Sequence, residues 1–184
     1  MAGKNYLRYA LTLGILILVA PGFLSVFFNL MQPEIASQDA RQESKNLKEV
    51  FPSAVRFEGV QERGAVAYYK ALGPRKNVLG YCFLVSRRGY TSDIVTLAGM
   101  DTQGVITRIK ILSQNETPGL GTRITEVTGK NTVPWFQEKF SGKRADALKN
   151  SVDAITGATI SSMAVIEGVQ EKAREIEQKV KNGR

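Results

Sequence analysis

The sequence predicts an α+β fold, in which one domain with a mainly antiparallel sheet and flanking helices follows a single N-terminal transmembrane helix. Residues 9–33 contain no charged side chain, and strand-like segments precede helix-like segments in the rest of the chain. That order is typical of α+β domains rather than of repeating βαβ units. We therefore divide the 184 residues into a cytoplasmic N-terminus with its membrane anchor, residues 1–33, and an extracytoplasmic domain, residues 34–184.

The anchor is predicted from its length and from the charges on either side of it. As a helix, the 25 residues 9–33 would reach about 37 Å, against about 30 Å of hydrocarbon in a bilayer. Lys4 and Arg8 precede the run, whereas Glu34 and Asp39 follow it, so the positive-inside rule places the N-terminus in the cytoplasm. The chain is then a single-pass protein of the cell (inner) membrane, held in the lipid bilayer with its domain on the periplasmic side.

Two alternatives to the anchor are a cleaved signal peptide and a buried globular helix. A signal peptide has a shorter apolar region of about 7–15 residues and a small-residue cleavage site, which this run lacks. A buried globular helix would not extend its apolar character as far as Phe27 and Phe28. An uncleaved anchor therefore remains the prediction.

The composition excludes several kinds of chemistry. The sequence has no histidine, so it cannot build a Ser-His-Asp triad or an imidazole metal site. Its one cysteine, Cys82, cannot form an internal disulfide or hold an iron–sulfur cluster, and its apolar neighbours predict a buried core residue. We therefore expect no catalytic residue and no metal site, and any electron carrier must be organic.

The net charge of +8 does not indicate a nucleic-acid partner. Without Lys4 and Arg8, residues 34–184 contain 23 basic and 17 acidic residues and carry a formal charge of +6. The basic residues are dispersed and are not interleaved with stacking aromatic side chains. An extracytoplasmic domain is also separated from nucleic acid, so we predict no such partner.

The first half of the domain is predicted to be mostly strand. A polar helix over residues 37–50 should end at Pro52. Alternating apolar residues between turn residues predict four strands, at residues 65–71, 80–85, 93–97 and 104–112. The turn before the last strand should be residues 101–104, because Asp and Gly supply hairpin geometry.

The second half is predicted to be mostly helical. Residues 135–140 read as a short helix with an aromatic face. Residues 161–180 have apolar side chains at helical spacing and charged side chains between them, which predicts an amphipathic terminal helix.

Hydroxyl-bearing and small residues gather directly before the terminal helix, in the segment Asp153–Ser162. A helix start exposes N–H groups and the positive end of the helix dipole, and Gly157 and Ala158 would let an anion approach the backbone. The segment is not a Walker A loop, so it gives no support to nucleotide hydrolysis. Taken alone, ordinary N-capping by Ser or Thr is the more common explanation.

A second segment, Glu116-Thr-Pro-Gly-Leu-Gly121, places two glycines around one leucine. Pro118 presets a turn, and the glycines leave room on either side of Leu120 for a flat ring. Taken alone, a tight surface loop is again the more common explanation.

The two segments together resemble the signatures of the FMN-binding domain family. Thr-Gly-Ala-Thr after Asp153 resembles its flavinylation motif, and Glu-Thr-Pro-Gly-Leu-Gly resembles its second signature. Within that family, the chain is most similar to the G subunits of Rnf electron-transport complexes, whose sister group is the C subunits of sodium-pumping NADH:quinone oxidoreductases. The resemblance covers roughly residues 1–180 and includes the single N-terminal span.

The resemblance implies how the cofactor is held. FMN would be joined through its phosphate to Thr159, by a phosphoester that a separate flavin transferase makes. The motif residues that would give access, order the turn or donate to the phosphate are Asp153, Thr156, Gly157, Ala158, Ser161 and Ser162. The flavin ring would lie against Thr117, Leu120 and Gly121, with Glu116, Thr122 and Trp135 as weaker candidates for its rim.

The resemblance also implies the function, an electron relay in a membrane complex that couples ferredoxin and NAD redox chemistry to cation transport. The partners would be the other membrane subunits of an Rnf-type complex, and the chain would have no independent active site. Two alternatives are a membrane-tethered, non-redox binding or assembly module and a flavoprotein of another exported electron-transfer chain. The first predicts no bound chromophore, and the second predicts covalent flavin without co-purifying multi-span subunits.

Overall fold

The computed structural model describes residues 3–62, 64–129 and 132–182, with the backbone alone for many positions among the first 39 residues. The chain forms two compact units, Met1–Glu43 and Ser44–Arg184. Within the described residues, no helix combines the length and the apolar character needed to cross a bilayer. Most side chains of the predicted anchor, including Lys4 and the flanking Glu34 and Asp39, lie outside the described residues.

The N-terminal helix is continuous where the sequence predicted two helical segments. Helix α1 runs from Gly3 to Val50. The residues between the predicted segments, Glu34-Ile-Ala36, are compatible with a helix, so nothing there stops it. Its C-terminal end agrees with the prediction, because a residue before a proline disfavours helical geometry and Phe51 precedes Pro52.

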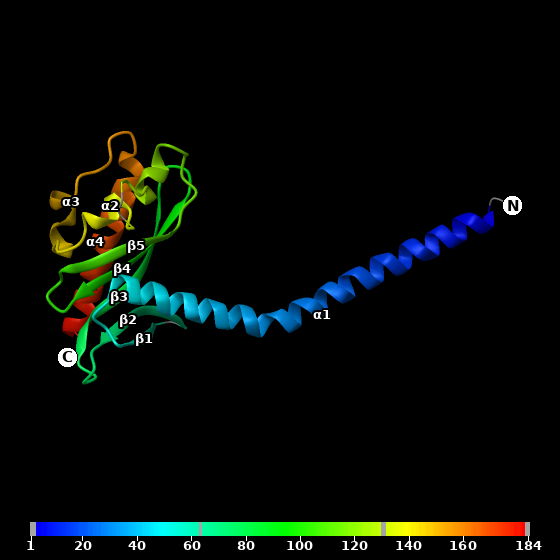
Figure 1. Cartoon of the computed structure of the whole chain (residues 1–184), viewed down its shortest axis with the longest axis horizontal. Helices are drawn as coiled ribbons and strands as arrows, with labels where there is room; N and C mark the ends of the chain where they lie inside the picture. The colour runs from blue at the N-terminus through cyan, green and yellow to red at the C-terminus, as the bar shows by residue number, and fades with distance from the viewer. Residues whose placement is uncertain (1–2, 63, 130–131, 183–184) are drawn as a thin grey trace. The chain divides into compact units, whose positions relative to one another are not determined.

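Five antiparallel strands follow one another across a single sheet in the order β1-β2-β3-β4-β5 (Figure 1). The strands are β1 (Arg56–Glu62), β2 (Ala65–Leu72), β3 (Val78–Arg88), β4 (Asp93–Asp101) and β5 (Ile106–Ser113). The predicted α+β class and the mainly antiparallel sheet are therefore confirmed. The predicted hairpin turn is present too, because the Asp101 carboxylate accepts hydrogen bonds from the N–H groups of Gln103 and Val105.

Strand β1 was not predicted from the sequence, and the C-terminal ends of β3 and β4 were predicted too early in the chain. Strand β1 lies at the edge of the sheet, and most of its side chains are exposed on both faces. It therefore lacks the apolar alternation that marks a half-buried strand. Strands β3 and β4 pair in continuous register from Gly80 opposite Asp101 to Arg88 opposite Asp93. This pairing extends β3 through the polar residues Ser86-Arg-Arg88 and β4 through Ala98-Gly-Met-Asp101.

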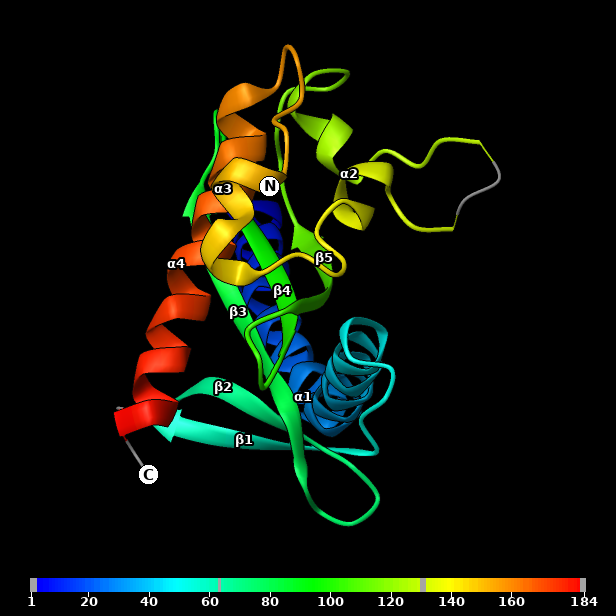
Figure 2. The same cartoon turned by 90° about the vertical axis from the view of Figure 1, so that its left-hand side faces the viewer.

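The two faces of the sheet are covered by different parts of the chain. Tyr81 and Phe83 of β3 point into the larger core, beneath helix α4 (Thr159–Asn182), which lies along β3 (Figure 2). Cys82, between them, points to the opposite face and is fully buried against Leu47 and other residues at the end of α1. Successive strand residues alternate between faces, so one sheet supports both cores.

Short helices complete the layer around α4. They are α2 (Trp135–Glu138), α3 (Leu148–Ser151) and the 3-10 turns η1 (Gly121–Thr125) and η2 (Ala145–Ala147). Helix α4 begins two residues earlier than predicted, at Thr159. The N–H of Ser162 donates to the carbonyl of Ala158 over 3.0 Å, which closes the first helical turn at that point.

The end of α1 is held on the sheet by polar contacts as well as by packing. The hydroxyl of Thr107 donates to the carbonyl of Val50 over 2.6 Å, and the Lys110 ammonium donates to Asn46 and pairs with Glu49. Gly99 makes this approach possible. A Cβ at Gly99 would lie 2.5 Å from the Thr107 hydroxyl and 2.7 Å from the Val50 carbonyl oxygen.

We expect Gly99→Ala to lower the free energy of unfolding by about 2 kcal/mol, because the backbone of α1 cannot move aside as a flexible side chain would. Gly59→Ala is the matched control, since a Cβ there would meet its nearest neighbour at 3.5 Å. Thermal unfolding followed by circular dichroism compares the two variants with the wild type. Equal losses in the two variants would contradict this account of the α1 contact.

Candidate functional site

Three loops that are distant in sequence surround a pocket of about 350 Å³ in the second unit. One loop is the β3–β4 turn, the second follows β5, and the third leads into α4. The pocket is lined by Tyr90, Glu116, Thr117, Leu120, Gly121, Gly157, Ala158, Thr159, Ile160 and Ser161. Its volume lies within the usual range for small-molecule sites, and both motifs singled out in the sequence contribute to it.

The loop after β5 contains a tight turn at Thr117–Leu120. The N–H of Leu120 donates to the carbonyl of Thr117 over 3.2 Å. Pro118 occupies the second position, and Gly119 occupies the third with a φ of +75°. These are the residue types that a type II turn requires at those positions. The turn leaves the Leu120 side chain 50% exposed at the pocket.

The loop before α4 contains a second turn of the same kind. The N–H of Ala158 donates to the carbonyl of Ile155 over 2.9 Å, and Gly157 holds a φ of +83° at the third position. A Cβ at Gly157 would lie 3.8 Å from Leu120, so the two turns lie side by side. Arg123 joins them further, because its guanidinium donates to the Thr156 carbonyl over 2.9 Å.

Thr159 is the first residue of α4 and is exposed at the pocket. Its hydroxyl has no hydrogen-bond partner among the described residues. The N–H groups of Thr159, Ile160 and Ser161 have no backbone acceptor within the described chain, as expected at a helix start. A free hydroxyl, unpaired donors and the positive end of a long helix dipole thus meet at one place, which suits an anionic group bonded to that hydroxyl.

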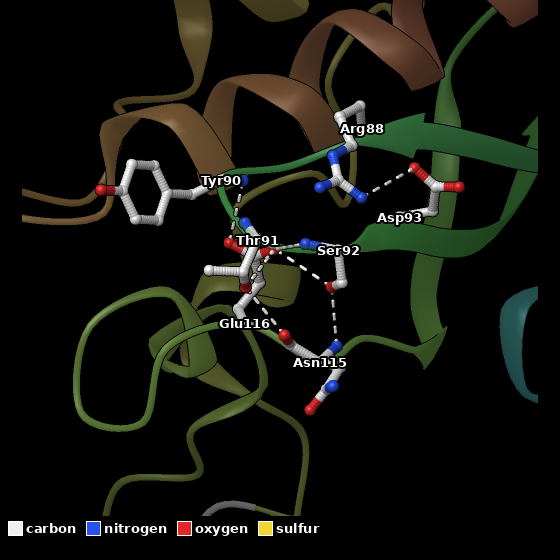
Figure 3. A network of polar contacts seen from close by, with 7 residues as sticks. All are labelled: Arg88, Tyr90, Thr91, Ser92, Asp93, Asn115 and Glu116. Carbon is white, nitrogen blue, oxygen red and sulfur yellow. Dashed lines mark hydrogen bonds and ion pairs between the residues drawn. The ribbon is translucent and has the colours of Figure 1, made fainter.

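Glu116 is buried, with 3% of its surface exposed, and accepts hydrogen bonds from two of the other segments. Its carboxylate accepts hydrogen bonds from the N–H groups of Tyr90, Thr91 and Ser92 over 3.0, 3.1 and 2.9 Å (Figure 3). It also accepts hydrogen bonds from three hydroxyls, those of Ser161, Ser92 and Thr91, over 2.5, 3.1 and 3.4 Å. Glu116 therefore ties the β3–β4 turn and the first turn of α4 to its own loop.

The hydrogen bonds to Glu116 decide its charge. Burial raises the pKa of the carboxyl. The hydrogen bonds from the Ser161 hydroxyl and the three backbone N–H groups lower the pKa by more than burial raises it, so that the net pKa is about 2. Donors that stabilise the charged form outweigh desolvation here, so the group is ionised at neutral pH.

Two glycines leave room around Glu116, Gly89 in the β3–β4 turn and Gly121 in the same loop as Glu116. A Cβ at Gly89 would lie 2.7 Å from a Glu116 carboxylate oxygen, and a Cβ at Gly121 would lie 2.6 Å from the Glu116 Cβ. The Thr91 hydroxyl also donates to the Asn115 carbonyl over 2.8 Å, so the β3–β4 turn is bonded to two consecutive residues of the β5 loop (Figure 3). The site is thus held by close backbone packing as well as by the carboxylate.

The pocket has an apolar rim. Tyr90 comes from the β3–β4 turn, Leu120 from the loop after β5 and Ile160 from the first turn of α4, and they are 66%, 50% and 55% exposed. Side chains of this size usually bury more of their surface. Their convergence on one pocket is typical of a site for an apolar or aromatic ring.

The comparisons with known proteins identify the family. The sequence profile of the FMN-binding domain matches residues 89–174, a range that contains every residue lining the pocket. The G subunit of an ion-translocating oxidoreductase complex from Methanosarcina acetivorans is 31% identical over 179 residues, which cover 90% of this chain and 92% of that relative. The chain belongs to this family of G subunits.

Another G subunit and one solved structure are also similar. The Acetobacterium woodii relative, the G subunit of a Na(+)-translocating ferredoxin:NAD(+) oxidoreductase complex, is 31% identical over 148 residues, 66% of this chain and 68% of that protein. The crystal structure of Shewanella oneidensis NqrC matches with a TM-score of 0.47 and 17% identity, over 70% of this chain and 74% of that chain.

The structure brings most of the residues predicted for the site together, but not all of them. The pocket lining includes Glu116, Thr117, Leu120, Gly121, Gly157, Ala158, Thr159 and Ser161. Thr156 is exposed on the turn beside them. Asp153, Ser162, Thr122 and Trp135 are not in the lining. Asp153 was expected to order the turn, yet it is exposed and makes no side-chain hydrogen bond with any described residue.

The hydroxyls of the two serines of the motif are hydrogen-bonded within the protein and are not open to a ligand. The Ser162 hydroxyl is fully buried, donates to the Ala158 carbonyl over 2.8 Å and accepts the Ile155 N–H over 3.1 Å. The Ser161 hydroxyl donates to Glu116. Ser162 therefore orders the turn, the role expected of Asp153, and neither hydroxyl proton faces an incoming phosphate.

Sequence reasoning missed Tyr90, Ile160 and Arg123. Tyr90 lies in Arg88-Gly-Tyr-Thr-Ser92, which carries only a turn signal. Ile160 has the apolar character expected of a core helix residue, and Arg123 follows the second motif without a pattern of its own. An aromatic residue in a glycine-containing turn was the only available signal, and it does not specify a site.

We expect Glu116→Gln to lower the free energy of unfolding by about 3 kcal/mol at pH 7. The pKa of Glu116 in the folded protein is about 2, below the ordinary value of about 4.3, so its contribution is complete above pH 5 and is lost as the pH falls towards 2. The gap between the wild type and the variant should therefore narrow between pH 5 and pH 2.

Urea unfolding at several pH values tests this expectation. Glu126→Gln is the matched control, because Glu126 follows on the same loop but its side chain is 50% exposed. The control should follow the wild type throughout. A gap between the wild type and Glu116→Gln that stays constant from pH 7 to pH 3 would show that the charge of Glu116 does not contribute.

Proposed function

We propose that this chain is the FMN-carrying electron relay of an Rnf-type complex, a membrane-bound, ion-translocating ferredoxin:NAD oxidoreductase, and that FMN is bound covalently to Thr159 by a phosphoester. Membership of the G-subunit family and the FMN-binding domain support the cofactor and the complex. The observation that carries the covalent link is the free Thr159 hydroxyl, which opens onto an apolar pocket at a helix start.

The residues present fit FMN in both of its chemical parts. The unpaired N–H groups at the start of α4 suit the phosphate, because helix starts favour negative charge. The apolar side chains of Tyr90, Leu120 and Ile160 suit the flavin ring. Gly157 and Ala158, which precede Thr159, have no bulky side chain that would block access to its hydroxyl.

FMN supplies the transfer of one or two electrons when it is bound, and the protein supplies its position. Glu116 and Ser161 fix the start of α4 relative to the other loops, and Ser162 closes the turn before Thr159. A covalent bond would keep the cofactor on an extracytoplasmic domain even when its affinity changes with redox state. No acid or base on this chain is required for the relay.

The modification requires a partner enzyme. A flavin transferase must reach the Thr159 hydroxyl, and the exposure of Thr156, Gly157 and Thr159 leaves that turn open to it. The other subunits of the complex would exchange electrons with the bound flavin. Of the alternatives considered, the non-redox binding module is disfavoured by the match to an FMN-binding domain.

We also propose that residues 9–33 anchor the chain in the cell membrane, with the N-terminus in the cytoplasm and the domain on the outer side. The support is the uncharged run itself, with Lys4 and Arg8 before it and acidic residues after it. A relay in an ion-translocating complex must work at a membrane, so the proposed function and the proposed anchor are consistent.

Thr159→Ala should abolish covalent flavin and leave the fold intact, because the exposed side chain contributes only its hydroxyl to the link. The chain is co-expressed with the flavin transferase, and flavin fluorescence is recorded in a denaturing gel. Thr159→Ser is the matched control, since it restores a hydroxyl and should restore at least part of the fluorescence. A fluorescent band of wild-type strength in Thr159→Ala would contradict the proposed link.

Arginines introduced into the uncharged run by substitution should release the chain from the membrane. We expect Leu13→Arg combined with Ile17→Arg to move most of the protein from the membrane pellet to the soluble fraction, because each arginine costs about 2.5–3.5 kcal/mol at the centre of a span. Gln38→Arg combined with Gln42→Arg adds the same charge after the run and should stay in the pellet. Alkaline extraction and immunoblotting provide the measurement, and equal behaviour of the two variants would contradict the anchor.

A further inference from the structure

Glu116 places a negative charge in the wall of the pocket where FMN is proposed to sit. We propose that this charge holds the reduction potential of the flavin at a more negative value than the same site would give without it. The inference rests on the proposed function, because it requires FMN in this pocket. It assigns Glu116 a role beyond the flavin rim, as a positioning residue that also sets the energy of the transferred electrons.

No cation among the described residues pairs with Glu116. All six of its hydrogen-bond donors, three backbone N–H groups and three hydroxyls, are neutral. The donors keep the group ionised, but they leave a full negative charge at a site that is 3% exposed. Such a charge is screened far less than one on the surface.

The charge lies close to whatever occupies the pocket. Its carboxylate hydrogen-bonds Ser161, two residues after Thr159, and packs against Gly121, and both of these residues line the pocket together with Glu116 itself. A pocket of about 350 Å³ keeps any ring within it near every wall. The field of Glu116 therefore acts on the proposed cofactor at short range.

A fixed negative charge opposes reduction of a flavin. When oxidised flavin takes up two electrons and one proton, the electrons come from a reductant that is itself oxidised, the proton comes from solvent, and the product carries one more negative charge than the oxidised form. Repulsion from Glu116 raises the energy of that product relative to the oxidised form. Removing the charge should therefore make the flavin easier to reduce.

The test uses the full chain, flavinylated by co-expression with the transferase and purified in detergent. Dithionite titration with a reference dye, followed by absorbance, gives the midpoint potential. Glu116→Gln should shift the midpoint potential of the flavin to a more positive value. At a given solution potential, the ratio of oxidised to reduced flavin should then fall about tenfold relative to the wild type. The shift should persist in high salt, because the charge is buried.

Two further variants separate the charge from the structural role of Glu116. Glu126→Gln removes the same charge from an exposed position on the same loop, and its effect should be small and disappear in high salt. Ser161→Ala removes the shortest hydrogen bond to Glu116 but keeps the carboxylate. The negative charge of the carboxylate is then stabilised by one hydrogen-bond donor fewer. The potential of Ser161→Ala should shift to a more negative value, opposite to that of Glu116→Gln.

The outcomes separate this inference from the proposed function. Wild-type protein without covalent flavin after co-expression with the transferase would contradict the proposed cofactor, and the inference with it. Flavinylated Glu116→Gln with an unchanged or more negative potential would overturn the inference alone. Shifts of the same sign in Glu116→Gln and Ser161→Ala would also overturn it, because loosening of the site would then explain both. If Glu116→Gln does not fold, the potential of Ser161→Ala tests the inference. An unchanged or more positive potential in Ser161→Ala would then overturn it.

Discussion

The site depends on the buried carboxylate of Glu116, which joins three parts of the chain that are far apart in sequence. Its oxygens accept hydrogen bonds from the β3–β4 turn and from Ser161 in the first turn of α4, while its own backbone leads into the Pro-Gly turn. Gly89 and Gly121 leave the space that this approach needs. Without the carboxylate, three adjacent N–H groups would lose their acceptor in a buried site, which is costly. The pocket exists because these loops are held together.

This arrangement separates the tasks of the two motifs. Among the described residues, the Thr159 hydroxyl has no partner and opens onto the pocket, whereas the hydroxyls of Ser161 and Ser162 are bonded inside the protein. The turn after β5 places Leu120 beside Gly157, and Tyr90 and Ile160 complete an apolar rim. A cofactor with a phosphate at one end and a flat ring at the other would use both parts. The sheet and α4 supply the rigid support on which such a site can be positioned.

The sequence predicted the features that depend on local chemistry. Turn residues such as Pro118 and Gly157 have strong backbone preferences, so both turns were correctly located from their residue types. Strand β1 was missed because an edge strand exposed on both faces carries no alternation. The role of Glu116 was underestimated, because its donors come from residues 24 to 45 positions away and no local pattern encodes them. For the same reason, the sequence could not show that the Ser161 hydroxyl is already bonded.

The most direct test of the account is mass spectrometry of the peptide that contains Thr159. Tryptic cleavage after Lys149 and Lys172 releases residues 150–172 as one peptide, because no lysine or arginine lies between them. After co-expression with the flavin transferase, the account predicts that this peptide carries the mass of FMN less one water, with fragment ions that locate the addition on Thr159. An unmodified peptide from protein made in the presence of active transferase would contradict the central claim.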